Sequence, residues 1–322
     1  MSTDVEKKVA EAEVVKAIRM DKAVADYFAT TPKRTTWNRV KIFRASGLAR
    51  TCPVQAAYVV RAVLEKDKET VMAWHLANQL PSRLIPILDQ GTVIHLQMQY
   101  YAGLTGFVPE GQWKCPNCGF FTRKKVPMPK VAIPGADGFD SEYPGKCPKC
   151  KGKNLKMYPP WLYVEPELEE PNAEKVRWQF RLTGKCDGIW RLNVRHGKKV
   201  VQVRAVADYK SINKNGFTGS YGGSLPKDSH IPQLQAYMAM ADLEWGVLVY
   251  YCKDNSEMKF CLVKRDRQAW KATMRRIEWA RSGSLNGKEK YRRCESFKDP
   301  NARACLFCEK CWGKKPPENF LS

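Results

Sequence analysis

The feature that most constrains the fold is a series of strand-forming segments in the second half of the chain. Aromatic and β-branched residues, partly alternating with polar ones, predict strands at 161–165, 176–182, 188–194, 200–208, 247–252 and 257–263. Apolar residues at helical spacing predict helices among them, at 230–243 and 266–281. A sheet with helices before, inside and after it indicates an α/β or α+β core.

Composition divides the chain into four regions. Residues 1–106 form a helical region, in which helices are expected at 12–30, 53–66, 69–79 and 84–102. Residues 107–160 are rich in proline, glycine, lysine and cysteine and show little periodicity, as expected of an insertion. Residues 161–285 hold the strands, with a glycine-rich loop at 215–224, and residues 286–322 form a cysteine-rich tail.

The charge balance points to a polyanionic partner. Lysine and arginine outnumber the acids by 55 to 33, which gives a formal charge of +22. Nucleic acid is the usual partner that relieves such self-repulsion, although a generic basic surface has the same composition. No apolar run is long enough to cross a bilayer, and the N-terminus lacks a signal-peptide pattern. We therefore expect a cytoplasmic protein without a membrane partner.

Two acids and a lysine are expected to meet at neighbouring strand ends. Asp208 and Lys210 are two residues apart after an apolar strand, so their side chains share one face of it. Asp187 ends the preceding strand segment and can lie beside them. Two close carboxylates repel, and Mg²⁺ or Mn²⁺ removes that repulsion. Such an ion polarises a phosphodiester and activates water, while Lys210 positions that water or neutralises the transition-state charge.

Taken alone, Asp-X-Lys is also common at solvated strand ends, so its neighbours matter. Upstream lies Gly91-X3-His95, although a histidine on an apolar helix is also a common core residue. Downstream, Gln233 and Tyr237 are one turn apart on a shared face of a helix.

The series Gly-X3-His, Gly-X2-Asp, Asp-Tyr-Lys and Gln-X3-Tyr, in that order, resembles the RecB-like branch of the PD-(D/E)XK nucleases. The resemblance spans residues 45–311 apart from the insertion. That branch includes CRISPR-associated spacer-acquisition nucleases and phage exonucleases, and residues 225–233 look like the phage-encoded members. The resemblance implies a restriction-endonuclease-like α/β core, in which a central mixed sheet is flanked by helices.

The resemblance also implies a role for each motif residue. A Mg²⁺ or Mn²⁺ ion would be held by His95, Asp187, Asp208 and the carbonyl of Tyr209. Lys210 would be the catalytic lysine beside Asp187 and Asp208. Two helix residues, Gln233 and Tyr237, would support the site or touch DNA. His230 would line the substrate channel or cap its helix.

Cysteines at the two ends of the chain resemble the iron–sulfur clasp of this branch. A 4Fe–4S cluster suits four thiolates, which we assign to Cys52, Cys294, Cys305 and Cys311, with Cys308 as the alternate. The usual Cys-X2-Cys-X5-Cys order is absent, and only the Cys305-X5-Cys311 interval is kept. The alternative is zinc at Cys294, Cys305, Cys308 and Cys311, with Cys52 merely buried.

The insertion carries two Cys-X2-Cys knuckles that are typical of a zinc ribbon. Their four thiolates, each pair with proline inside and glycine nearby, would bind one Zn²⁺; they belong to Cys115, Cys118, Cys147 and Cys150. The lysines around them either contact the DNA backbone or keep a small module in solution.

Two classes of function follow from these patterns. The first is a Mg²⁺- or Mn²⁺-dependent deoxyribonuclease, expected to act as an exonuclease on single strands or DNA ends in recombination, repair or replication. The second is a non-catalytic DNA-binding protein built on a nuclease-derived fold, which would act with recombination or replication proteins. The intact set of Asp187, Asp208 and Lys210 favours the enzyme, since a scaffold does not need all three.

Overall fold

The structure is a computed structural model of the 322-residue chain. It describes residues 37–49, 51–77, 91, 93–95, 97–99, 102, 110–114, 118, 126–127, 149–150, 162–164, 166–196, 199–219, 224–296, 299, 302 and 305–313. The helix expected at 12–30 lies outside these ranges. Across them, no helix has the length and apolar character that a membrane span requires.

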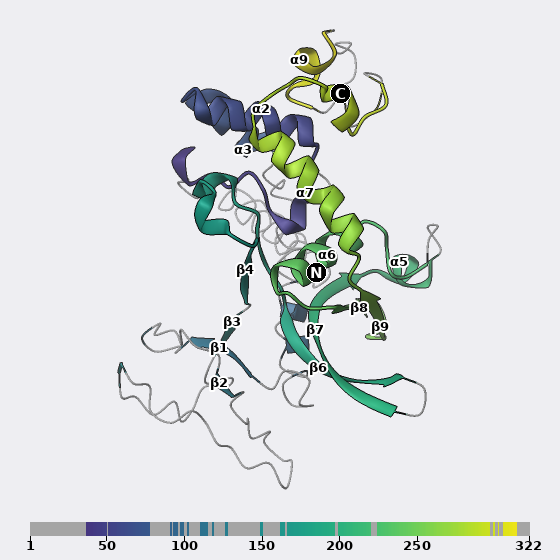
Figure 1. The fold of residues 1–322 in the computed structure, drawn as a ribbon. Coiled ribbons are helices and arrows are strands. Elements are labelled where there is room, and N and C mark those ends of the chain that lie inside the picture. The colour runs from purple at the N-terminus through teal and green to yellow at the C-terminus, as the bar shows by residue number, and fades with distance from the viewer. Residues whose placement is uncertain are drawn as a thin grey trace, which may run out of the picture.

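A four-stranded mixed sheet forms the centre of the fold (Figure 1). Its strands, in the spatial order β6-β7-β8-β9, are Gly188–His196, Lys199–Ile212, Trp245–Cys252 and Met258–Lys264. The outer pairs β6–β7 and β8–β9 are antiparallel, whereas β7 and β8 are parallel. The predicted α/β class with a mixed sheet and flanking helices is confirmed.

Helices cover both faces of the sheet. On one face lies α6 (Ile231–Met240), whose Leu234 and Met238 are fully buried against the sheet residues Val206 and Leu248. The other face is covered by helical residues within 91–102, which we call the His95 helix. Three of its apolar residues, Ile94, Met98 and Ala102, pack with Trp190, Tyr209 and Val247 of the sheet. The central strand β8 is therefore apolar on both faces, as buried parallel strands are.

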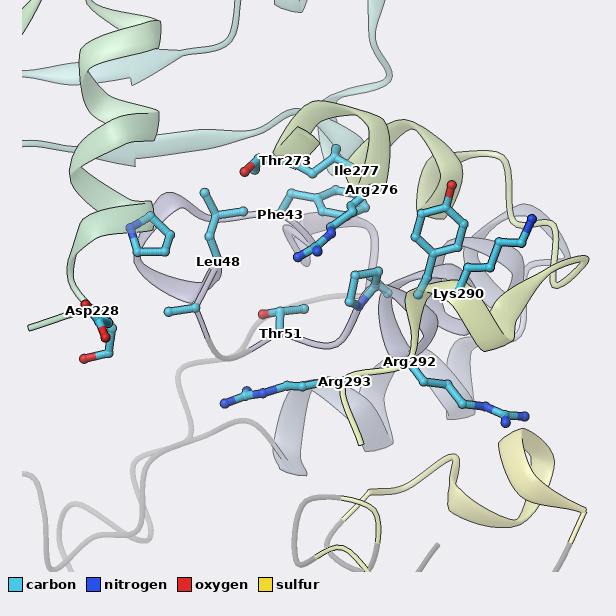
Figure 2. A pocket seen from close by; sticks show the side chains of 16 residues that line it. Phe43, Leu48, Thr51, Asp228, Thr273, Arg276, Ile277, Lys290, Arg292 and Arg293 are labelled. Atoms are coloured by element: carbon cyan, nitrogen blue, oxygen red, sulfur yellow. The ribbon is translucent and has the colours of Figure 1, made fainter. Parts of the chain in front are cut away.

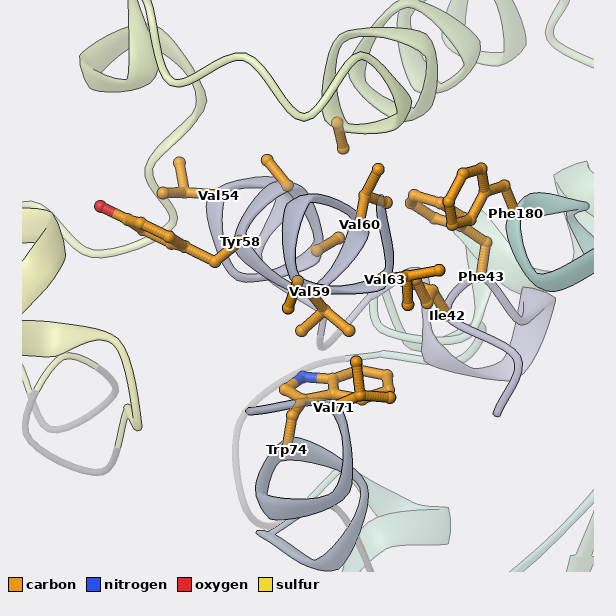
Figure 3. Close-up of a cluster of buried hydrophobic side chains, with 14 of the residues drawn as sticks. Ile42, Phe43, Val54, Tyr58, Val59, Val60, Val63, Val71, Trp74 and Phe180 are labelled. Atoms are coloured by element: carbon orange, nitrogen blue, oxygen red, sulfur yellow. The ribbon is translucent and has the colours of Figure 1, made fainter. Parts of the chain in front are cut away.

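A separate helical layer packs above the sheet at the N- and C-terminal ends of the described chain (Figure 1). It contains α2 (Pro53–Leu64), α3 (Lys68–Ala77), α7 (Arg267–Arg281), η6 (Lys288–Tyr291) and α9 (Cys308–Trp312). Helix α2 is buried along most of its length: seven of its twelve residues are valine or alanine, and all seven are buried. Figure 3 shows its valines between Trp74 of α3 on one side and Phe43 and Phe180 on the other.

The start of α7 follows from a single side chain. Asp266 precedes the helix, and its carboxylate accepts hydrogen bonds from the backbone N–H groups of Gln268 at 2.8 Å and Ala269 at 2.9 Å. These are donors that a helix leaves without a partner at its first turn.

Five short strands precede the central sheet. The first three, β1 (Glu110–Lys114), β2 (Val126–Pro127) and β3 (Leu162–Val164), form a sheet in the order β2-β1-β3. The other two, β4 (Glu167–Glu169) and β5 (Thr183–Lys185), pair antiparallel. Strands β1 and β2 belong to the expected insertion. Of its four predicted zinc ligands, Cys118 and Cys150 are among the described residues, whereas Cys115 and Cys147 lie outside them.

The prediction of a strand at 176–182 is wrong. This segment contains the 3-10 turn η5 (Trp178–Phe180), preceded by η4 (Ala173–Lys175). The carbonyl of Val176 accepts a hydrogen bond from Arg181 Nε at 2.9 Å, which closes the turn. Phe180 and Leu182 are directed into the core around α2 instead of along a sheet. The apolar pattern is therefore that of a core segment without strand pairing.

The loop predicted at 215–224 begins as a helix. Lys214–Thr218 form α5, in which the side chain of Asn213 accepts a hydrogen bond from Gly216 N at 2.9 Å. Gly219 ends the helix at φ +82°, a left-handed conformation that glycine adopts without strain. Asparagine before a segment and glycine after it are signals for the start and the end of a helix. The high glycine content of this segment favoured a loop and masked these signals.

One buried ion pair links α7 to the segment before the sheet, and we predict that its loss destabilises the fold. Arg281 pairs with Glu170 and donates from Nε to the carbonyl of Phe180 at 2.9 Å. Arg281→Met would leave the Glu170 carboxylate, 2% exposed, without its cation. We expect a loss of about 3 kcal/mol in the free energy of unfolding, measured by urea denaturation. The control Arg275→Met, at an exposed position of the same helix, should change it by less than about 0.5 kcal/mol.

Candidate active site

Asp208 and Lys210 lie on the same face of β7, as predicted. Lys210 Nζ is 2.8 Å from Asp208 Oδ2, and the two side chains are 18% and 4% exposed. Strand β7 continues to Ile212, past the end predicted from the sequence, so both residues sit within the sheet rather than at a solvated end. The side-chain alternation of a strand is what brings them together.

Asp187 lies between β5 and β6 and is held against β7. Its backbone N–H donates to the carbonyl of Ala207 at 3.1 Å, and its Oδ2 accepts a hydrogen bond from the backbone N–H of Tyr209 at 2.5 Å. Its other carboxylate oxygen, Oδ1, is 3.0 Å from His95 Nδ1. The Asp187 side chain therefore joins the His95 helix to the point on β7 where Asp208 and Lys210 stand.

Gln99 is a residue of this site that the sequence analysis missed. It is buried on the His95 helix and donates from Nε2 to the backbone carbonyl of Asp187 at 3.3 Å. It follows His95 by four residues, so both side chains lie on one helix face. The sequence signal that could have identified Gln99 is therefore its position four residues after the histidine of the Gly-X3-His motif.

Burial and neighbouring charges shift the pKa values of Asp208 and His95. The pKa of Asp208 is raised to about 6, mainly by burial and also by the charge of Asp187, while the ammonium of Lys210 opposes the rise. Burial lowers the pKa of His95, but its hydrogen bond to Asp187 and the charges of Asp187 and Asp208 outweigh that effect, so the net direction is upward. Burial thus dominates the shift of Asp208, whereas the nearby carboxylates dominate that of His95.

A chain of three side chains fixes Lys210 from the α6 side. Lys210 Nζ donates to Gln233 Oε1 at 3.0 Å, and Gln233 Nε2 donates to Tyr237 Oη at 2.8 Å. Burial, and then the charge of Asp208, raise the pKa of Tyr237, so its hydroxyl stays neutral. Tyr237 thereby orients the Gln233 amide with its oxygen toward the lysine.

Steric crowding requires a glycine at position 184, in the Gly-X2-Asp motif. A Cβ at this position would lie 2.5 Å from Tyr237 Cε1 and 2.9 Å from the Cβ of Ala45. The absence of a side chain lets the Tyr237 ring lie against β5, and so places the hydroxyl that orients Gln233.

The donor set at the acid pair fits a hard divalent cation. Asp208 Oδ2 is buried and, apart from its ion pair with Lys210, has no hydrogen-bond partner among the described residues. Two carboxylates and a backbone carbonyl are oxygen donors of the kind Mg²⁺ and Mn²⁺ prefer. Within the described ranges, however, no three histidine, cysteine or acidic side chains stand together as a preformed ligand group. The Nδ1 atom of His95 is engaged by Asp187 instead.

His230 packs beside the site without capping its helix. It precedes α6, and its side chain makes no capping hydrogen bond. Its Nδ1 is 2.9 Å from Tyr250 Oη, and the two rings are stacked with centroids 5.7 Å apart. Tyr250 is the β8 residue paired with Lys210, so His230 and Lys210 are near neighbours across the sheet.

The five N- and C-terminal cysteines gather in one neighbourhood around α2 and α9. Cys52 precedes α2, Cys308 and Cys311 lie in α9, and Cys305 Sγ is 2.9 Å from Gln55 Nε2 of α2. Burial raises the pKa of the Cys305 thiol, and Cys52 and Cys311 add to that effect. Burial likewise raises the pKa of Cys294, again with contributions from Cys52 and Cys311. The structure thus brings together the residues chosen from the sequence, without arranging four of them as finished ligands.

Comparisons with known proteins give distant structural likenesses only. No family model and no curated protein sequence matches this chain. The chain is similar to SSO0001, at 13% identity over 85% of this chain and 89% of that one, with a TM-score of 0.33. It is also similar to the alkaline exonuclease LHK-Exo from Laribacter hongkongensis, at 16% identity over 39% of this chain and 59% of that one, with a TM-score of 0.29.

The same exonuclease in complex with dAMP matches at 17% identity, over 34% of this chain and 52% of that one, with a TM-score of 0.26. The chain therefore matches little more than half the length of that enzyme. Likenesses at these TM-scores define neither the family nor the function, which must be argued from the residues of the site.

We predict that Gly184→Ala destabilises the protein and disturbs the site. The new methyl group must displace the Tyr237 ring or Ala45, and overpacking of this kind costs about 1–3 kcal/mol. Urea denaturation measures the loss. Gly91→Ala is the matched control, because a Cβ there would be 3.5 Å from Ser211 Oγ, an ordinary contact, and alanine favours the helix. Equal stability of the two variants would contradict the packing argument.

Proposed function

We propose that this protein is a metal-dependent deoxyribonuclease that hydrolyses phosphodiester bonds. The observation that carries the proposal is the pair of buried acids, Asp187 and Asp208, beside Lys210 within a mixed sheet. The lysine is held there by Asp208 Oδ2 and by Gln233 Oε1. The net charge of +22 supports nucleic acid as the substrate.

In this proposal Asp187 and Asp208 hold Mg²⁺ or Mn²⁺, with the carbonyl of Tyr209 and with His95 as a further ligand or as the residue that orients Asp187. When bound, the ion polarises the phosphodiester and lowers the pKa of an attacking water. The hydrogen bond from Tyr209 N–H to Asp187 Oδ2 fixes that carboxylate relative to the Tyr209 carbonyl. The protein thus sets the ligand positions through the backbone of β7.

Lys210 supplies the positive charge on the substrate side. Its ammonium lies 2.8 Å from Asp208 Oδ2 and donates to Gln233, and a third N–H remains to approach a phosphate oxygen or the water. Tyr237 holds Gln233 as the acceptor, so the lysine head group does not have to be ordered during the reaction.

Burial of the acids favours an enzyme over a non-catalytic DNA-binding protein. Asp208 is 3% exposed, and its pKa is raised to about 6 mainly by burial. Charged groups held this way are unfavourable for stability, and apolar residues of similar size usually replace them without loss. A scaffold would gain nothing from the arrangement, whereas a metal-dependent hydrolase requires it.

The finer assignments rest on the sequence motifs. We propose a RecB-like nuclease of the PD-(D/E)XK class, which acts as an exonuclease on single strands or DNA ends in recombination, repair or replication. We also propose a 4Fe–4S cluster at Cys52, Cys294, Cys305 and Cys311, with Cys308 as the alternate, and Zn²⁺ at Cys115, Cys118, Cys147 and Cys150. The gathering of the terminal cysteines around α2 and α9 supports the first of these two metal sites.

Two substitutions test the catalytic assignment. We expect Asp208→Asn and Lys210→Met each to lower Mg²⁺-dependent cleavage by at least about 10²-fold, because the first removes a charged ligand of the proposed metal and the second removes the cation that faces the phosphate. Cleavage is followed on single- and double-stranded DNA labelled separately at the 5′ and 3′ ends, which also shows the polarity. Lys264→Met, an exposed lysine of β9, is the control and should cut like the parent. Undiminished cleavage by both active-site variants would refute the assignment.

The terminal metal site has a separate test. Protein purified without oxygen should be brown, with broad absorbance near roughly 400 nm, as iron–sulfur clusters show. Cys52→Ser should remove this absorbance, whereas the control Cys261→Ser, in β9, should leave it unchanged. A colourless preparation with zinc in both cysteine sets would overturn the cluster in favour of the zinc alternative.

A further inference from the structure

A pocket of about 480 Å³ lies beside the acid cluster, between α2, α7, residues 290–293 and the start of α6 (Figure 2). Cavities of this size accept a nucleotide-sized group. Its wall combines apolar side chains with hydroxyl groups: Phe43, Leu48 and Ile277 are of the first kind, and Thr51 and Thr273 are of the second.

The pocket is basic. Four cationic residues and one acid, Asp228, line it, and the cations are Arg276, Lys290, Arg292 and Arg293. Figure 2 shows the guanidinium groups of Arg276 and Arg293 toward the pocket, whereas Arg292 and Lys290 point away from its centre. Arg292 is used by the fold, since it donates to the carbonyl of Cys311 at 2.7 Å and lies 4.0 Å over the Trp312 ring. Arg276 and Arg293 are the two cations whose guanidinium groups lie on the pocket side.

The first turn of α6 separates the pocket from the acid cluster. Asp228, Ser229 and Pro232 line the pocket. The neighbouring residues face the other way: Gln233 accepts from Lys210, and His230 contacts Tyr250. Because Pro232 and Gln233 are consecutive, one edge of the pocket is a single residue away from the side chain that holds the proposed catalytic lysine.

We propose that this pocket is a phosphate subsite for the DNA strand, one step away from the bond that is cut. Arg276 and Arg293 bind a backbone phosphate, and the adjoining sugar or base packs on Phe43 and Leu48. The inference rests on the proposed nuclease function, because it places the strand across the first turn of α6 toward Lys210. Arginine suits this role, since its planar guanidinium pairs with phosphate oxygens through two parallel hydrogen bonds.

The placement of the cations favours a strand over a free mononucleotide. The two arginines come from separate elements, α7 and the segment after η6, and the pocket that they line includes Pro232, which precedes the Gln233 that accepts from Lys210. A strand in the pocket would therefore continue past the first turn of α6, whereas a free mononucleotide has no such continuation. Phosphate contacts of this kind hold a nucleic acid in register without reading its sequence.

Binding of a fluorescent single-stranded oligonucleotide, measured by anisotropy in the presence of a chelator, tests the subsite without cleavage. We expect Arg276→Ala and Arg293→Ala each to raise Kd by about 10-fold. Each should also lower the slope of log Kd against log salt by about one, because one phosphate contact is lost. The control Arg275→Ala removes an equally exposed arginine from the neighbouring position of α7, outside the pocket, and should leave both quantities near the parent values.

Several results would overturn the subsite. If Arg275→Ala weakens binding as much as Arg276→Ala, only the general charge of α7 matters. If dAMP or inorganic phosphate binds through Arg276 in calorimetry while oligonucleotide affinity does not depend on Arg276, the pocket takes small phosphates and not a strand. Equal thermal unfolding midpoints of all variants exclude a folding defect as the cause. A protein that binds DNA through Arg276 but does not cut it would support the subsite and overturn only the nuclease function.

Discussion

The contact of the Asp187 carboxylate with β7 is the interaction on which the rest of the site depends. One oxygen accepts the backbone N–H of Tyr209, and the other meets His95. Through this single side chain, the entry to β6, the middle of β7 and the His95 helix are fixed relative to one another. Asp208 and Lys210 flank Tyr209, so their directions follow from the same contact.

Helix α6 joins three otherwise separate parts of the molecule. Its apolar side chains pack on the sheet, and its Gln233 and Tyr237 hold Lys210. Its first turn forms part of the wall of the basic pocket. Helix α7 likewise connects several parts of the helical layer. It packs on α2, contributes Arg276 to the pocket and pairs with Glu170 through Arg281. The pocket therefore lies where the sheet layer and the cysteine-bearing layer meet.

Much of the site could be predicted from the sequence, because its geometry follows local periodicity. Alternation along β7 places Asp208 beside Lys210, and helical spacing places Gln233 beside Tyr237. The residues that depend on tertiary packing could not be predicted this way. Gln99 donates from the His95 helix to the carbonyl of Asp187, and glycine is required at 184 by the Tyr237 ring of α6.

The errors in the fold have the same origin. Residues 176–182 carry the aromatic and branched side chains of a strand, yet Phe180 and Leu182 fill the core around α2. Burial, rather than strand pairing, explains their apolar character. At 215–224 the glycines suggested a loop, yet Gly219 ends α5, a helix that Asn213 begins. Composition alone does not distinguish these cases, because both depend on which partner a segment meets.

The charges of the site explain why a cation and a phosphate belong together there. Asp187 and Asp208 carry two negative charges, and Lys210 balances one of them at 2.8 Å. The group as it stands repels a phosphodiester, since it retains one uncompensated negative charge. With a divalent cation the same three residues become a positively charged group, and the Lys210 ammonium is drawn less strongly to Asp208. In the proposed function, attraction for the substrate at the acid pair would depend on the bound cation, whereas the arginines of the neighbouring pocket would attract the strand without it. The pocket would then hold the backbone, and the acid pair would bind the phosphate to be cut only when the cation is present.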